Sequence, residues 1–125
     1  MSASVQRTSA SASSSAPIDR LVPLCTEAVN AAETFAAAAR SAVRNTVAPR
    51  GKVDAGLLNE HQFPVHGYAW IATYVAGLRQ MLGWAERLGE AGHIGELEQL
   101  ILQAAFGEYL NQLAGGIAIS QVEIV

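Results

Sequence analysis

The stretch from Val65 to Leu88 carries two adjacent apolar stripes, each with residues that recur at intervals of three and four. This spacing places the members of each stripe on one face of an α-helix. The stripes consist of Tyr68, Ile71, Val75, Leu78, Leu82 and Ala85, and of Trp70, Tyr74, Gly77, Met81, Trp84 and Leu88. Together they form an apolar arc that is wider than a single helix–helix contact requires. The sequence therefore predicts a helix that lies centrally in a bundle or at a subunit interface.

Two further long helices are predicted, one on each side of this segment. The first should run from about Arg20 to Val47, and the last from about Gly95 to Ala114, where apolar residues cover much of the circumference. The apolar stripe of the first helix is mostly alanine, so a partner helix can approach it closely. Its members are Leu21, Cys25, Ala28, Ala32, Phe35, Ala39 and Ala42.

The ends of these helices are predicted from capping and helix-breaking residues. Asp19 is expected to cap the first helix, and Asp54 to cap a short helical turn in the connector. Pro64 should mark the boundary before the central helix, because the residue that precedes a proline avoids the helical region. Gly115 and Gly116 are expected to end the last helix and to begin an extended link.

These elements predict an all-α fold, in which three long helices form an up-down bundle with short loops. Three helices would leave one of the wide apolar arcs uncovered, so the bundle is interpreted as an incomplete four-helix bundle. Ser120 and Glu123 fit a capping box, which indicates the start of a further helix. We therefore expect a disordered Ser/Ala-rich leader over residues 1–18 and a helical domain over 19–125 that is truncated at its C-terminal end.

The net charge and the amino-acid composition argue against several classes of protein. The net charge is −3, Lys52 is the only lysine, and the arginines are scattered, so no basic surface for nucleic acid is indicated. Cys25 is the only cysteine, which excludes an internal disulfide and a cysteine-based zinc site. No apolar run approaches the roughly 20 residues that a membrane span requires. We expect a cytoplasmic protein with no nucleic-acid partner and no membrane partner.

Most side chains capable of chemistry have a structural explanation. His61 and His66 are separated by Pro64 and do not share a helix face, so no metal site is predicted. Cys25 belongs to the alanine-rich stripe and is interpreted as a small buried hydrophobic residue. Arg79 is expected on the polar face of the central helix, although pairing with an acid or binding an anion stays open. Trp70, Tyr74 and Trp84 are expected in the core, with stacking on a ring-shaped ligand as the alternative. Glu60 beside His61 is a possible acid–base pair, and His93 is expected to be solvated in a loop.

Two segments carry a resemblance to a known family. They are HGYAWIATYVAGLRQMLGWAERL and GELEQLILQAAFGEYLNQLAGGIAISQVEIV. Both resemble acyl-CoA dehydrogenases, in particular the helical N-terminal extension of the methylsuccinyl-CoA dehydrogenase type. The resemblance covers roughly Leu57 to Val125, while the alanine-rich first helix agrees only in character.

The resemblance implies a flavoprotein in which FAD accepts hydride from the β carbon of a short branched or dicarboxylic acyl-CoA, such as methylsuccinyl-CoA. In that family a Gly-Gly pair after a long helix lies near the FAD of a neighbouring subunit, and Gly115 and Gly116 resemble this pair. They are therefore the candidate cofactor-binding residues, although no aromatic residue and no arginine cluster follow them. No catalytic glutamate matches, so the resemblance implies no catalytic residue in this chain.

The resulting hypothesis is an N-terminal packing and assembly portion of a larger FAD-dependent acyl-CoA dehydrogenase. Its partners would be the rest of that chain and, in a homo-oligomer, further copies, and the segment alone would be inactive. The alternative is a stand-alone helical module that self-associates through the face from Trp70 to Trp84 without catalysis. A third possibility is a small bundle that holds an apolar ligand between its aromatic residues.

Overall fold

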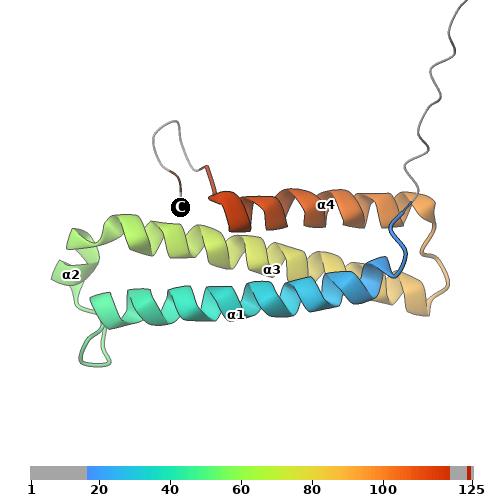
Figure 1. The fold of residues 1–125 in the computed structure, drawn as a ribbon. Coiled ribbons are helices and arrows are strands. Elements are labelled where there is room, and N and C mark those ends of the chain that lie inside the picture. The colour runs from blue at the N-terminus through green and yellow to red at the C-terminus, as the bar shows by residue number, and fades with distance from the viewer. Residues whose placement is uncertain (1–16, 119–123, 125) are drawn as a thin grey trace, which may run out of the picture.

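The computed structural model describes residues 17–118 and residue 124, and these fold into a bundle of α-helices (Figure 1). The helices are α1 (Leu21–Val47), α2 (Ala55–Glu60), α3 (Gln62–Glu90) and α4 (Glu96–Gly115). The long helices α1, α3 and α4 pack together and run in alternating directions, while the short helix α2 lies where α1 connects to α3 (Figure 1). The predicted all-α class and the up-down arrangement of three long helices are confirmed.

The predicted boundaries of α1 and α4 differ from the observed ones by at most one residue, but α3 begins earlier and ends later than predicted. Pro64 does not mark a boundary, because it is the third residue of α3. The first four N–H groups of a helix have no acceptor within that helix, so a proline in the first turn removes no intrahelical bond. The local preference of the residue before proline is overridden at Phe63, which lies inside the helix.

The prediction for the cap of α1 is wrong, and the prediction for the cap of α2 is confirmed. The position before α1 is Arg20, not Asp19, and Arg20 adopts a left-handed conformation with φ 58° and no side-chain cap. This turn directs the preceding backbone toward α4, where the Ile18 N–H donates a 3.0 Å hydrogen bond to Oε1 of Gln103. α1 therefore begins without a side-chain cap, and the segment before it is held to α4 by this tertiary contact. Asp54 accepts hydrogen bonds from the N–H groups of residues 56 and 57, at 2.9 and 3.1 Å.

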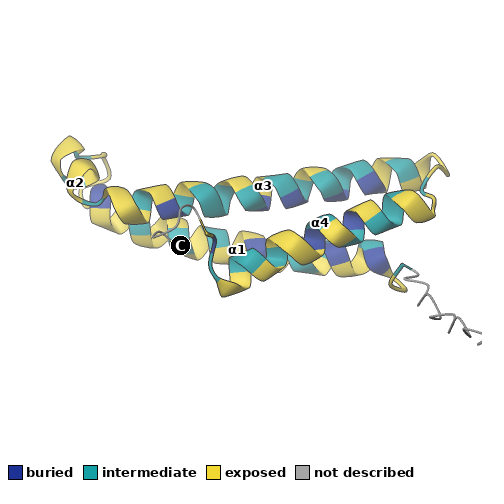
Figure 2. Ribbon diagram, turned by 90° about the horizontal axis from the view of Figure 1, so that it is seen from above, coloured by how far each residue is buried: buried dark blue, intermediate teal, exposed yellow. Residues whose placement is uncertain are grey.

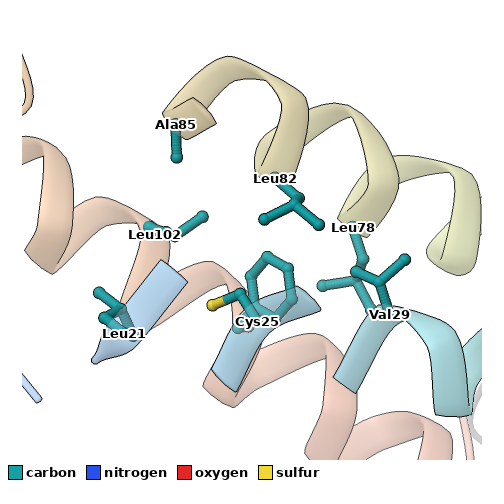
Figure 3. Packing of buried hydrophobic residues seen from close by; sticks show 8 residues of the cluster. Leu21, Cys25, Val29, Leu78, Leu82, Ala85 and Leu102 are labelled. Atoms are coloured by element: carbon teal, nitrogen blue, oxygen red, sulfur yellow. The ribbon is translucent and has the colours of Figure 1, made fainter. Parts of the chain in front are cut away.

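The core lies at one end of the bundle, where all three long helices meet. It is formed by the first half of α1, the second half of α3 and the middle of α4 (Figure 3). Its buried members are Leu21, Cys25, Val29, Leu78, Leu82, Ala85, Leu102 and Phe106. In Figure 2 the end of the bundle that carries α2 is largely exposed. Burial of apolar area therefore stabilises mainly the end that lies opposite α2.

The uneven core follows from the lengths of the helices. α4 has 20 residues and α3 has 29, so α4 covers only part of the α1–α3 pair (Figure 1). After α4, Ile117 is buried, and Ala118 forms an isolated antiparallel bridge with Ile124. The predicted capping box of Ser120 and Glu123 lies outside the described residues. No helix in the described part of the chain is long and apolar enough to cross a membrane.

Candidate functional site

Gly115 and Gly116, the candidate cofactor-binding residues, lie at the C-terminal end of α4. Gly115 is the last helical residue, and Gly116 is the cap, with φ 106° and ψ 133°. The φ angle of Gly116 lies in the region that favours glycine. The conformation of the helix cap therefore accounts for a glycine at this position. The N–H of Gly116 donates a 2.8 Å hydrogen bond to the backbone oxygen of Gln112. The predicted helix end is confirmed.

The flavin contact expected of these two glycines stays a prediction. The N–H of Gly116 is already bonded within the chain, so it is not free to hold a phosphate or a ring oxygen. Among the described residues, a Cβ atom added at Gly115 would meet no atom within 4 Å, so no close contact between these residues requires a glycine there. A flavin near Gly115 would need most of its contacts from elsewhere.

The histidines do not come together into a site. His61 lies at the junction of α2 and α3, His93 lies in the exposed loop before α4, and His66 lies on α3. Nε2 of His66 accepts a 3.0 Å hydrogen bond from Nε1 of Trp70, so His66 has a structural partner. Among residues 17–118 and 124, no group of three His, Cys, Asp or Glu side chains is arranged to hold a metal ion.

The aromatic residues of α3 form a continuous series that reaches α4. The rings of His66 and Trp70, of Trp70 and Tyr74, and of Tyr74 and Tyr109 meet edge to face, with centroids 6.3, 6.1 and 4.8 Å apart. Such geometry is typical of packed aromatic pairs. Trp84 packs against the core cluster. Trp70, Tyr74 and Trp84 were predicted in the core, but all three are only partly buried and lie at its margin. α4 covers part of the face that was expected to mediate self-association.

Cys25 has the buried environment that was predicted for it. It lies in the core between Leu21 and Val29 and is only 3% exposed (Figure 3). Burial raises the pKa of the Cys25 thiol to about 11. A thiol with this pKa is almost entirely protonated at neutral pH and is therefore a poor nucleophile. The environment of Cys25 does not support a catalytic role.

Arg79 pairs with an acid, which is one of the alternatives left open by the sequence. Its Nη2 atom lies 2.6 Å from Oε2 of Glu33, and its Nε donates a 2.8 Å hydrogen bond to Oε1 of the same carboxylate. This two-point contact joins α3 to α1 on the surface of the bundle. The hydrogen bond from Arg79 holds the pKa of Glu33 below its ordinary value. The sequence alone gave no signal for Glu33 as the partner, because the two residues are far apart in the chain.

An apolar groove between α1 and α4 is another surface feature that sequence reasoning did not locate. Its volume is about 430 Å³. Residues from both helices line it, including Leu24, Cys25 and Ala28 of α1 and Phe106, Gly107 and Leu110 of α4. The small residues of the α1 stripe were the available signal, since they leave space beside the helix. Among the described residues the arrangement offers apolar contact rather than acid–base or nucleophilic chemistry.

Comparison with known proteins shows that the chain is similar to part of a much longer protein. No family model matches the chain. The chain is 50% identical over 103 residues, which are 82% of its length, to (2S)-methylsuccinyl-CoA dehydrogenase from Cereibacter sphaeroides. It spans 19% of the length of this curated relative. The predicted resemblance is thereby confirmed, and the chain is homologous to part of an acyl-CoA dehydrogenase.

Proposed function

We propose that this chain is the N-terminal helical packing and assembly portion of an FAD-dependent acyl-CoA dehydrogenase. The enzyme would act on a short branched or dicarboxylic acyl-CoA such as methylsuccinyl-CoA. The observation that carries the proposal is the 50% identity over 82% of the chain to a dehydrogenase of that name. The flavin and the catalytic base would be held by parts of the polypeptide outside these residues.

The structure supports a packing role through the surfaces that the bundle leaves uncovered. Large apolar side chains are exposed on both outer helices, among them Leu24 and Phe35 of α1 and Leu97 and Ile101 of α4. The apolar residues of α4 are distributed around the whole helix, which is typical of a helix enclosed on several sides. A bundle of this kind is stabilised when further protein covers these faces.

The test uses the complete gene product that contains residues 1–125, here called the full polypeptide, beside the 125-residue chain. The full polypeptide should purify with a protein-bound flavin spectrum and should oxidise methylsuccinyl-CoA in the presence of an electron acceptor. The 125-residue chain should do neither, because the proposal assigns the flavin and the catalytic base to parts of the polypeptide outside these residues. Flavin binding and acyl-CoA oxidation by the 125-residue chain would contradict the proposal.

The alternative of a stand-alone interaction module predicts a different outcome. A module would form a well-defined oligomer that melts cooperatively, without any flavin in the full polypeptide. Sedimentation of the 125-residue chain distinguishes the two hypotheses, since an incomplete part of an enzyme should associate irregularly through its exposed apolar faces. A defined dimer together with a flavin-free full polypeptide would favour the module.

A further inference from the structure

The α1–α4 groove belongs to a longer apolar surface that follows α1. Leu24 and Ala28 line the groove, and the same helical stripe continues through Phe35, which is 46% exposed, to Ala39 and Ala42. These residues are separated by intervals of three, four or seven, so they share one face of α1. The surface runs from Leu24 to Ala42, about 27 Å at 1.5 Å per residue.

A second hollow lies along this stripe at the end of the bundle that α4 does not cover. Ala39, Ala42 and Val43 of α1 line it, together with Gly67 and Ile71 of α3. Its volume is about 290 Å³, and its lining is almost entirely apolar. One occupant that follows the α1 stripe would fill both hollows and cover Phe35 between them.

The shape of this surface suits an α-helix. It follows one face of α1 for about 27 Å. Ala28, Ala39 and Ala42 on this face have small side chains, so the backbone of a second helix can approach closely there. In an up-down bundle of four helices, the fourth helix lies against the first and the third. Here those helices are α1 and α4, which flank the groove.

The course of the chain after α4 indicates where such a helix would enter. The bridge between Ala118 and Ile124 keeps the backbone at Ile124 beside the C-terminal end of α4. From there, a helix along the α1 stripe would run antiparallel to both α1 and α4 and would continue the up-down alternation. The dehydrogenase relative is much longer than the matched segment, which covers 19% of it, so such a polypeptide has ample chain to supply this helix.

We propose that one amphipathic helix from the same polypeptide lies antiparallel to α1 and α4 and covers the α1 stripe from Leu24 to Ala42. This inference rests on the proposed function only in requiring that the segment belongs to a longer polypeptide. It deepens that proposal by naming the surface, the partner and its direction.

The test measures alkylation in the full polypeptide at single introduced cysteines. Phe35→Cys and Leu24→Cys lie on the α1 stripe, and Ala37→Cys is the matched control on the same helix. Ala37 is exposed and lies about 160° around the helix from Phe35. Peptide mass spectrometry measures the alkylation rate at each position, and circular dichroism checks that each variant is folded.

The two stripe cysteines should react about tenfold more slowly than the control or slower still, since they would react only when the covering helix opens. This protection should not change on dilution, because the occupant belongs to the same chain. Reaction of Phe35→Cys and Leu24→Cys at the rate of Ala37→Cys would overturn the inference. So would protection that disappears on dilution, which would assign the surface to a second copy. Flavin content and acyl-CoA oxidation of the same sample test the proposed function separately.

Discussion

The hydroxyl of Tyr74 on α3 donates a 2.8 Å hydrogen bond to Oε1 of Gln112 on α4. Nε2 of Gln112 in turn donates to the carboxylate of Glu108, one turn earlier in α4. The ring of Tyr74 also meets the ring of Tyr109 edge to face. The contact thus fixes the register of α4 against α3 near the end of α4, beyond the main core.

Tyr74→Phe should lower the free energy of unfolding by about 0.5–1.5 kcal/mol, the usual net contribution of one hydrogen bond. The ring contacts would remain, so the change isolates the hydroxyl. Tyr109→Phe is the control, because its hydroxyl makes no hydrogen bond within the described residues. Urea unfolding of both variants measures the difference. An equal loss in the two variants would show that the bond to Gln112 does not stabilise the fold.

Glu33→Gln should destabilise the bundle at neutral pH by a small amount that disappears in acid. The folded-state pKa of Glu33 lies below its ordinary value of 4.5, first because of the hydrogen bond from Arg79. The stabilisation is therefore present above the unfolded-state pKa and is lost as the pH falls through the folded-state pKa. The pair is exposed, so salt should also weaken the effect.

The measurement is the urea midpoint of the wild type and of Glu33→Gln at neutral pH and in acid. Glu27→Gln provides the matched control, since Glu27 is an exposed glutamate of the same helix without an ion-pair partner among residues 17–118 and 124. If Glu33→Gln and Glu27→Gln had the same effect at every pH, the contact with Arg79 would contribute nothing to stability.

Cys25 should make the free energy of unfolding fall as the pH rises from 9.0 to about 11. Burial raises the pKa of the folded thiol from 9.0 to about 11, so the unfolded thiol loses its proton first. The stabilisation is complete below the unfolded-state pKa and is lost as the pH rises through the folded-state pKa. The difference in unfolding free energy between wild type and Cys25→Ala isolates this group. A difference that stays constant over this range would contradict the burial of the thiol.

The positions of the long helices were predictable because their apolar spacing is regular over many turns. The first part of the alanine-rich stripe and the Leu78–Leu82–Ala85 part of the central helix are buried, with Val29 as a buried addition. The later part of the α1 stripe is not covered, and Phe35 on it is 46% exposed. Turn chemistry was predictable where it is local, as at Asp54. The predictions failed at Asp19 and at Pro64. Contacts with another helix decide the conformation before α1, and the first turn of α3 tolerates Pro64.

The features of the surface were less accessible from sequence. The pair of Glu33 and Arg79 and the bond between Tyr74 and Gln112 depend on the relative register of two helices, which the apolar period alone does not specify. The α1–α4 groove likewise depends on how the start of α1 and the middle of α4 are placed relative to each other. The glycines at the end of α4 were located correctly as a helix end, while their proposed contact with a cofactor stays a prediction.

Leu102→Ala should be strongly destabilising, because Leu102 is fully buried where α4 meets α1 and α3. Removal of a buried leucine side chain leaves a cavity and costs about 2–5 kcal/mol. The total free energy of unfolding of a domain of this size is about 5–15 kcal/mol, so the variant should lose a large share of its stability. Leu97→Ala, on the same helix at 64% exposure, should change the free energy of unfolding by about 0.5 kcal/mol or less. Urea unfolding measures both variants, and similar losses would mean that α4 does not pack with the face that contains Leu102 toward the core.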